Sequence, residues 1–400
     1  MALLSDGTLA AVRSDRQAAE ADQTAAQRQR WPALDLNGTY TQFEHAPNLD
    51  IATPAGQLQA PIWRNNGYGL AGADVSVPLW TSGKISGAIG VAAAGARGAN
   101  AQEVRSTADL KLAVVESYVA VFRGRRALIV AESNVASLKA HADDVQVLYD
   151  KQAVPQSDVL AAQVALANAT QQQLRAANGL RLATAAYNRW VGQPLDRAPV
   201  LDEPAATPGT TTSLPLDQLM AQAVERRPEL TAISAQQEGL EQTARSERAQ
   251  GLPQIVLHAG YNHIDNAILD RENFASIGIG FQWRIFDSGQ LQARTSALHS
   301  RAHAAELRLA DLRSQVRLDT ETAYYNREEA AARIHAAAAA VAQAEENVRI
   351  ARELYANGLG TNNQVLDAET LHVIAVTNRD DARFDAIVAE YRLQRAIGAL

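Results

Sequence analysis

Apolar residues alternate with polar or small residues in four segments of about ten residues each. In the first segment Leu34, Leu36 and Tyr40 fall on one face, and in the last Ile277 and Ile279 are separated only by a glycine. A period of two predicts β-strands whose two faces meet different surroundings. Roughly ten residues is also the length that a tilted strand needs to cross a bilayer. The predicted strands cover about residues 33–43, 68–80, 254–264 and 274–286.

A long segment without proline follows each pair of strands. In the first of these, Leu112, Val115 and Val119 are spaced by three and four residues, which is the spacing of a coiled coil. We therefore expect one long helix over about residues 85–150 and another over about 290–357. At about 1.5 Å per residue, each would form a rod of roughly 100 Å.

The segment Leu354–Thr370, LYANGLGTNNQVLDAET, interrupts the second helical pattern. Gly358 and Gly360 permit left-handed backbone, so the helix can stop and reverse there. Either Asn362 or Asn363 can cap the helix that follows. These features predict the tip of a helical hairpin.

An earlier segment of the chain repeats this arrangement. LYDKQAVPQSDVLAAQV at Leu148–Val164 matches Leu354–Thr370 at an offset of 206 residues, the difference between positions 148 and 354. LWTSGK at Leu79–Lys84 matches IFDSGQ at Ile285–Gln290 at the same offset. Pro155 is expected to begin the helix that returns from this first tip. A repeat of this length indicates two copies of one large unit.

The two predicted structural repeats are residues 1–200 and 217–400, and residues 201–216 form a linker between them. The helices expected at the start and the end of the repeats are Leu9–Arg30 and about 156–192 in the first, and Gln218–Gln250 and about 362–398 in the second. WPALDLNGTY at position 31 matches LPQIVLHAGY at position 252, an offset of 221, so the first repeat has 15 extra residues (221 minus 206). They fall in Pro47–Asn66, a segment rich in proline and asparagine that we expect to be a loop.

Composition narrows the possible functions. A hydrophobic content of 47% with 20% charged residues is typical of a folded protein, and a net charge of −7 argues against a nucleic-acid partner. The absence of cysteine excludes disulfides, thiolate metal sites and cysteine catalysis. His299 and His303 have the i, i+4 spacing of a metal-binding pair, but solvated histidines are the favoured interpretation. No nucleophile–base pair, metal site or cofactor site is predicted.

The N-terminal segment does not have a basic start followed by an apolar stretch of signal length. The second repeat also carries the segment PLDQLMAQAVERR at its start, early in its first predicted helix. The first repeat has no counterpart of that segment. We therefore expect that the sequence is truncated or begins at a misplaced start.

Five short motifs lie along the chain in the order and spacing of one family: RRPEL at Arg226–Leu230, PQIVLHAGY, FDSGQLQAR at Phe286–Arg294, YANGLGTNNQVLDAE and the terminal LQRAIGAL. Together with the duplicated unit, they resemble the TolC-like family of outer-membrane efflux proteins across nearly the whole chain. The resemblance implies a mainly α-helical fold with a β-barrel part. Three copies would share a 12-stranded outer-membrane barrel, continuous with a long periplasmic α-helical barrel.

The resemblance also implies the function. The protein would be the passive exit duct of a tripartite efflux pump or type I secretion system, and not an enzyme. It would lie in the outer membrane, extend into the periplasm, and bind a periplasmic adaptor (membrane fusion) protein and an inner-membrane transporter. The residues do not separate small-molecule efflux from protein export.

In this family the second hairpin narrows the pore, which implies a pore aperture formed by Asp367, Gln364, Tyr355, Asp158 and Ser157. Carboxylates there would form acidic rings, although the chain has glutamine at position 364, where the family often has a second acidic residue. The alternative interpretation is a solvated helix-start carboxylate for Asp367, ordinary packing for Tyr355, and helix capping for Ser157 and Asp158.

The resemblance places adaptor docking at the two hairpin tips, which comprise Ala153, Val154, Pro155, Gly358, Leu359 and Gly360. Turn formation alone is the alternative role of these residues. In the first tip, Gln152 stands where the second tip has Gly358. In the second tip, Gly360 stands where the family often has an arginine.

Tryptophans occur at or near the ends of the predicted strands, at positions Trp31, Trp63, Trp80 and Trp283. Aromatic girdles at a membrane interface account for this distribution, and helix–strand packing is the alternative. For the whole chain, the competing hypothesis is a soluble coiled-coil scaffold or interaction protein, which the missing export signal favours. A self-inserting pore toxin is a third class, but it would not need two matched helical tips.

Overall fold

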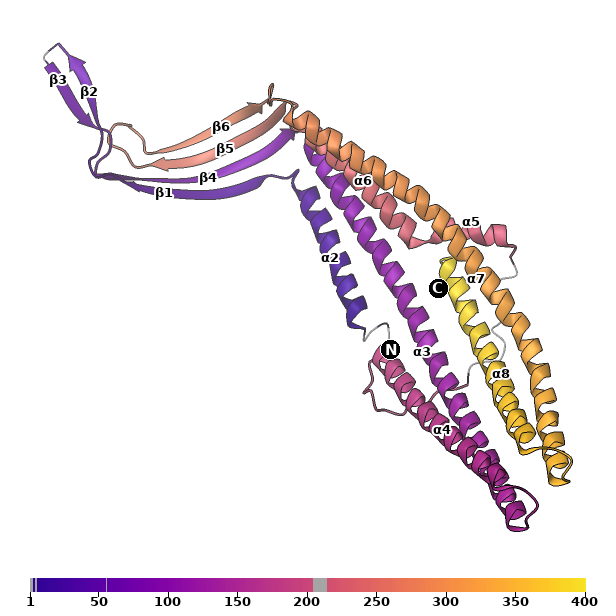
Figure 1. Ribbon diagram of the computed structural model, residues 1–400. Coiled ribbons are helices and arrows are strands. Elements are labelled where there is room, and N and C mark those ends of the chain that lie inside the picture. Colours follow the sequence, from indigo (N-terminus) through magenta and orange to yellow (C-terminus); the bar gives the residue numbers. More distant parts are fainter. Residues whose placement is uncertain (1–2, 4–5, 55, 204–213) are drawn as a thin grey trace. The chain divides into compact units, whose positions relative to one another are not determined.

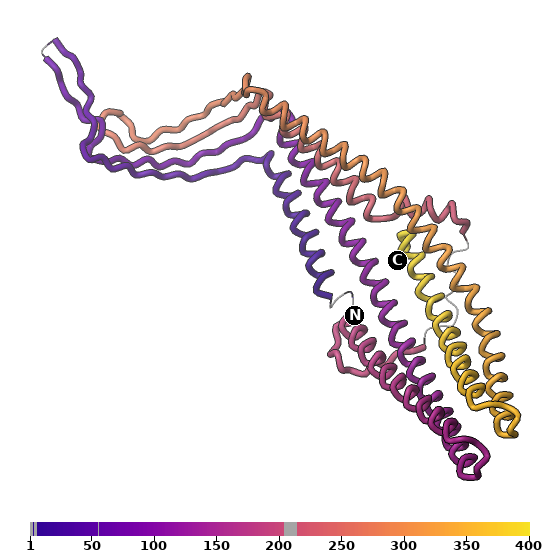
Figure 2. The backbone as a smooth tube through the Cα atoms, in the orientation of Figure 1, coloured from indigo at the N-terminus to yellow at the C-terminus, as the bar shows by residue number. Residues whose placement is uncertain are grey.

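The computed structural model describes residues 3, 6–54, 56–203 and 214–400. The chain is mainly helical and has a sheet part (Figures 1 and 2). The described helices are α2 (Gly7–Arg28), α3 (Lys84–Asp150), α4 (Gln156–Val191), α5 (Leu216–Arg226), α6 (Pro228–Ala249), α7 (Gln290–Ala356) and α8 (Asn362–Ala396). The strands are β1 (Ala33–Gln42), β2 (Asn48–Thr53), β3 (Gly56–Pro61), β4 (Gly67–Trp80), β5 (Gln254–Ile264) and β6 (Asn273–Gln282). None of the described helices is both long enough and apolar enough to cross a membrane.

The chain forms two compact units, and each takes segments from both halves of the sequence. One unit contains Met1–Ser14, Asn100–Thr231 and Leu309–Leu400, and the other contains Asp15–Ala99 and Ala232–Arg308. The units therefore do not coincide with the sequence repeats 1–200 and 217–400. A long helix buries its apolar stripe by packing against another element, and here helices from opposite halves pack together.

Packing between the halves is direct in the first unit. Val119 and Phe122 of α3 form a buried cluster with Phe384, Ile387 and Val388 of α8. Val119 belongs to the stripe spaced by three and four residues, so the coiled-coil spacing is used between helices that lie far apart in the sequence.

The main sheet has four antiparallel strands in the order β1-β4-β5-β6. Because residues directly opposite each other share a face, the register places Leu34 beside Val75, and Leu257 beside Ile279, on one face. That face is apolar and open to its surroundings, with Leu36 80% and Ile277 78% exposed. The opposite face carries polar residues that include Asp35, Asn37, Asp74, His258, Asn262 and Ser276.

The last strand of the sheet is shorter than expected. The sequence pattern predicts a strand to residue 286, but β6 ends at Gln282, which pairs with Gln254, the first residue of β5. Pro253 precedes Gln254 and has no N–H to donate to a ladder. Residues 283–286 therefore continue the apolar pattern without a strand to pair with.

The expectation of a loop over Pro47–Asn66 is also wrong. The segment contains the β2–β3 hairpin, in which Ile51 lies opposite Leu58. Its prolines avoid the middle of both strands: Pro47 precedes β2, Pro54 follows it, and Pro61 is the last residue of β3. Proline has no N–H to donate to a ladder, and it is tolerated at such strand ends. The turn signals that indicated a loop thus mark the ends of two short strands.

The helix expected over Gln218–Gln250 is two helices. It breaks at Arg227, whose backbone is extended (φ −65°, ψ 120°). A proline disfavours helical backbone at the residue before it, and Pro228 follows directly. Residues 204–213 of the predicted linker lie outside the described residues.

Left-handed backbone recurs at the turns at the offset of 206 residues found in the sequence. Ser82 (φ 51°) corresponds to Ser288 (φ 56°), and Gln152 (φ 60°) corresponds to Gly358 (φ 72°). Each return helix ends shortly before a glycine with left-handed backbone. Helix α4 ends at Val191, before Gly192 (φ 70°), and α8 ends at Ala396, before Gly398 (φ 71°). The two halves therefore use the same turn conformations even where the residues differ.

Candidate functional site

The tip between α7 and α8 is built by backbone geometry and one side-chain cap. Gly358 adopts φ 72°, and the amide of Leu359 donates to the carbonyl of Leu354 at 2.9 Å. The cap of α8 is Thr361: its hydroxyl accepts from the amide of Gln364 at 3.4 Å, and the Gln364 side chain accepts from the Thr361 amide at 2.9 Å. The expectation that Asn362 or Asn363 caps this helix is therefore wrong, because a capping box one residue earlier performs that role.

Asn362 is instead buried between the two hairpins. It is 3% exposed, its amide nitrogen donates to the carbonyl of Asp158 at 3.2 Å, and its Oδ1 lies 2.7 Å from Nε2 of His141. With the amide in this orientation, His141 Nε2 is the donor. The contact joins α3, the start of α4 and the start of α8.

The predicted contact residues Tyr355 and Asp158 meet in the same place. The Tyr355 hydroxyl donates to Asp158 Oδ2 at 3.3 Å, and the Tyr355 ring lies 5.6 Å from that of His141. Burial, followed by the charge of Asp158 and the hydrogen bond to it, raises the pKa of Tyr355 to about 12. We call His141, Asp158, Tyr355 and Asn362 the tip cluster.

The other predicted aperture residues lie on the surface of the single chain. Ser157 and Asp367 are exposed, and Gln364 is exposed while it closes the capping box. The structure thus brings Tyr355 and Asp158 together and leaves Asp367 facing outward from the first turns of α8.

A second polar contact, absent from the sequence analysis, lies near the tip cluster. Glu369 of α8 is 2% exposed, forms an ion pair with Arg352 of α7, and accepts from the hydroxyl of Ser137 of α3 at 3.1 Å. A carboxylate buried to this degree requires a cationic partner. It therefore ties the second hairpin to α3.

The sequence contained a signal for one of these missed residues. His141 lies in a stripe with Leu138, Val145 and Leu148, at steps of three and four residues, and the stripe is otherwise apolar. Leu138 and His141 are 6% and 5% exposed and Val145 is fully buried. A polar residue inside an apolar stripe requires a buried partner, but its identity came only from the fold.

The first tip has the same outline with different residues. Ala153 donates its amide to the carbonyl of Leu148 at 2.9 Å, Val154 packs on the buried cluster below the tips, and Pro155 precedes α4 as its N-cap. In the second tip, Leu359 is 77% exposed. Both tips thus combine an exposed turn with an anchored base.

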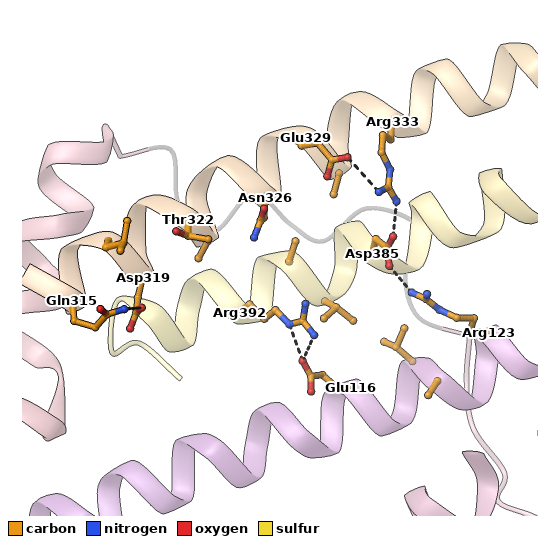
Figure 3. A pocket seen from close by; sticks show the side chains of 17 residues that line it. Glu116, Arg123, Gln315, Asp319, Thr322, Asn326, Glu329, Arg333, Asp385 and Arg392 are labelled. Atoms are coloured by element: carbon orange, nitrogen blue, oxygen red, sulfur yellow. Dashed lines mark hydrogen bonds and ion pairs between the residues drawn. The ribbon is translucent and has the colours of Figure 1, made fainter. Parts of the chain in front are cut away.

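A groove runs along α8 between α3 and α7, with a volume of about 750 Å³. In Figure 3, Asp385 lies between Arg123 and Arg333, and Arg392 is directed at Glu116. Asp385 accepts from Arg123 at 2.6 Å, and Arg392 donates to Glu116 at 2.8 Å. Burial by itself would raise the pKa of Asp385, but hydrogen bonds from the two arginines lower it. These ion pairs hold three helices together on the polar side of α8.

The RRPEL motif joins the α5–α6 break to the end of α8. Arg227 donates to the carbonyl of Ala396 at 2.8 Å, and Arg395 donates to Glu229 at 2.6 Å and to Asp109 at 2.7 Å. Burial by itself would raise the pKa of Glu229, but the hydrogen bond from Arg395 and the charges of Arg395 and Arg227 hold it below its ordinary value. The motif therefore has a packing role that the sequence analysis did not assign.

Aromatic residues gather at both ends of the sheet. Trp31 precedes β1, Trp80 ends β4 and Trp283 follows β6, so all three lie at one end, and they are 72%, 60% and 51% exposed. At the other end, the ring of Trp63 stacks on Tyr68 with the centroids 4.0 Å apart. The two groups are separated by the length of the strands.

Within the part of the chain that the structure describes, no three histidine, aspartate or glutamate side chains gather as a metal site would require. His303 lies 3.1 Å from Glu306, and both His299 and His303 are exposed. The candidate functional features are therefore polar contacts between helices and a sheet that has one apolar and one polar face.

Residues 219–399 match the family described as "Outer membrane efflux protein". Among curated proteins, the chain is 23% identical over 299 residues to "Alkaline protease secretion protein AprF" of Pseudomonas aeruginosa, covering 73% of this chain and 62% of AprF. It is also 23% identical over 312 residues to "Outer membrane protein TolC" of Vibrio cholerae, covering 76% of this chain and 71% of that protein. The chain thus spans less than two thirds of AprF.

Solved structures share the fold over the whole chain. The outer-membrane channel OprN superimposes with a TM-score of 0.86 at 18% identity, covering 100% of this chain and 88% of OprN. VceC from Vibrio cholerae superimposes with a TM-score of 0.84 at 20% identity, covering 99% of this chain and 94% of VceC. The mainly helical fold with a sheet part is therefore the fold of TolC-like channels.

Residues 219–399 accordingly match the outer membrane efflux protein family, and the similarity of the chain to the TolC-like family of outer-membrane efflux proteins, expected from the sequence, is confirmed.

Proposed function

We propose that the chain is one subunit of a trimeric outer-membrane channel that serves as a passive exit duct. The observation that carries the proposal is the four-stranded sheet, which combines an exposed apolar face, a polar opposite face and edge strands β1 and β6. An exposed apolar sheet of this kind is unfavourable in water. Its residues match those of a lipid-facing strand in alternation and in length.

Closure of the sheet requires further copies. The outer edges of β1 and β6 have backbone groups that no strand of the described chain pairs, and such groups are not tolerated in lipid. Pairing β1 of one copy with β6 of the next joins the edges, and three copies of four strands form a 12-stranded barrel. The apolar face would then meet lipid and the polar face would line the lumen.

The aromatic residues support the same orientation. Trp31, Trp80 and Trp283 at one end of the sheet and Trp63 with Tyr68 at the other correspond to the two girdles of a membrane barrel. The end of the sheet from which α3 and α7 follow β4 and β6 would face the periplasm.

The helical tips supply the proposed partner surface and aperture. The exposed turns at Ala153 and at Gly358 and Leu359 would dock a periplasmic adaptor protein, which connects to an inner-membrane transporter. Asp367 would repeat three times around the axis, and the tip cluster would hold the second hairpin against α3. No reaction chemistry is part of this proposal.

The proposed cargo is an exported molecule, with efflux and protein secretion as its two forms. The name of AprF links that relative to secretion of an alkaline protease, and the family name refers to efflux. Both forms use the same duct.

The deciding experiment is the native mass of the complex. An export signal is added, the outer-membrane fraction is extracted in mild detergent, and the mass is measured. A trimer in that fraction is the expected result. A soluble monomer or a two-chain coiled coil, absent from membranes despite export, would overturn the proposal and favour the scaffold.

A further inference from the structure

The β2–β3 hairpin presents an apolar face that the described chain leaves open. Leu49 and Ile51 of β2 share a face with Leu58 of β3, because Ile51 is paired with Leu58 and Leu49 with Ala60. These three side chains are 43%, 40% and 58% exposed. A two-stranded hairpin is marginal in water by itself, so this face requires a partner.

The base of the hairpin is held firmly. The carbonyl of Ile62 accepts from the amide of Ala267 at 3.0 Å, and Arg64 forms an ion pair with Glu272 at 2.6 Å. Both contacts join the base to the β5–β6 connection, residues 265–272. The hairpin therefore stands at one end of the sheet, beside that connection.

The β5–β6 connection has exposed apolar residues of its own. Ile268 and Leu269 are 49% and 54% exposed. Asn266, which is 4% exposed, donates to the carbonyl of Ile264 at 2.9 Å and accepts from the amide of Ile268 at 3.0 Å. A buried asparagine thus fixes a turn that directs two aliphatic side chains outward.

Strand order makes these two surfaces neighbours across a subunit boundary. The hairpin follows β1, one edge of the sheet, and the connection precedes β6, the other edge, at the same end of the strands. When β1 of one copy pairs with β6 of the next, the hairpin of the first copy meets the connection of the second. This step rests on the proposed trimeric barrel.

We propose that Leu49, Ile51 and Leu58 of one subunit pack on Ile268 and Leu269 of the adjacent subunit, so that the β2–β3 hairpin extends the subunit interface beyond the sheet. The occupant of the apolar hairpin face is therefore a second copy of this chain. The 15 extra residues of the first half would serve assembly.

Cysteine cross-linking tests the contact, since the 400-residue sequence has no cysteine of its own. The variant pair Leu58→Cys with Leu269→Cys is purified as the native complex and oxidised. Dimeric and trimeric species are expected on non-reducing gels, because side chains that pack across the interface can approach within the short Cα separation that a disulfide requires. The matched control is Gln59→Cys with Leu269→Cys, which uses the opposite face of β3. We expect about tenfold less cross-linking there, since alternate strand residues point to opposite faces.

Three results would overturn this proposal. The first is equal cross-linking in the control, and the second is a disulfide between the two cysteines of a single chain. The third is a complex of trimeric mass that does not cross-link. The last would leave the proposed channel intact. A monomeric native mass, measured on the same preparation, would instead mean that the proposed function had failed.

Discussion

At the scale of single residues, the tip is organised by a few polar side chains placed among apolar ones. Tyr355, Asp158, Asn362 and His141 form one connected cluster, whereas Asp367 faces outward a short distance away. Buried polar contacts hold the hairpins in one arrangement, and the exposed carboxylate is available to the surroundings. These two kinds of residue lead to different predictions.

Asp367→Ala is expected to reduce the cation preference of single channels and to weaken block by divalent cations. Three carboxylates around one axis attract cations strongly where water is confined. The measurement is reversal potential in asymmetric salt and current with added divalent cations, with Asp367→Asn as the size-matched variant. Unchanged selectivity and block in both variants would remove Asp367 from the conduction path.

Tyr355→Phe is expected to destabilise the protein by about 1 kcal/mol near neutral pH, through loss of one hydrogen bond. Because the folded pKa of Tyr355 is raised to about 12 from 10.0, the contribution is present below pH 10 and is lost as pH rises through 12. Thermal unfolding in detergent should therefore show a wild-type advantage that shrinks over this range. An advantage independent of pH would contradict the assigned hydrogen bond.

At the scale of elements, matched turns adopt one conformation with different residues. Gln152 and Gly358 both have left-handed backbone, which costs a residue with a Cβ about 1 kcal/mol. A Cβ added at Gly358 would meet no atom within 4 Å, so only backbone strain separates the two positions. The first tip keeps the conformation because Val154, which packs on the buried cluster, and Pro155, the N-cap of α4, fix the chain that follows the turn.

Gln152→Gly is expected to stabilise the first tip by about 0.5–1 kcal/mol, since glycine removes the strain but adds freedom to the unfolded chain. The reverse change, Gly358→Ala, should destabilise the second tip by about 1 kcal/mol. Unfolding midpoints of the two variants and of Gln152→Ala provide the comparison. A Gln152→Gly variant that is less stable than Gln152→Ala would refute the strain.

A further element-scale prediction concerns the contact between α5, α6 and α8. Glu229→Gln should cost about 2 kcal/mol at pH 7, because it removes the charged acceptor of Arg395. Since the pKa of Glu229 is lowered in the folded state, its contribution is full above the ordinary pKa of 4.5 and is lost as pH falls through the lowered value. Unfolding midpoints at pH 7 and pH 3 should therefore differ less for the variant than for the wild type. Parallel pH curves would show that Glu229 is not the linked group.

At the scale of the whole molecule, the two faces of the sheet have opposite fates in the proposed channel. Ile277 lies on the apolar face and is 78% exposed, while its neighbour Ser276 lies on the polar face. In water the exposed apolar face would favour aggregation, whereas in a bilayer its contact with lipid would favour insertion.

Ile277→Arg is expected to disfavour insertion by about 2–4 kcal/mol if the residue lies near the bilayer midplane. Ser276→Arg, one residue away, should leave insertion nearly unchanged, because it would face the aqueous lumen. The amount of protein in the outer-membrane fraction, relative to exported protein, measures both. Equal loss in the two variants would contradict the assignment of faces.

Much of this architecture was determined by local pattern. Period-two alternation predicted the four main strands, and proline-free stripes predicted α3 and α7, because these signals depend only on neighbours along the chain. The hairpin at residues 48–61 escaped prediction since its strands are short and bounded by residues typical of loops. The break at Arg227 was recoverable from Pro228 alone.

The sequence by itself determined the four main strands, the long helices, the duplication and the family resemblance, since propensity, periodicity and motif order can be read from neighbouring residues along the chain. Only the tertiary structure decided which distant residues meet. His141 with Asn362, Glu369 with Arg352, and Glu229 with Arg395 come from different helices. Such partners depend on how helices rotate and pack, and a single sequence does not encode that arrangement in any local signal.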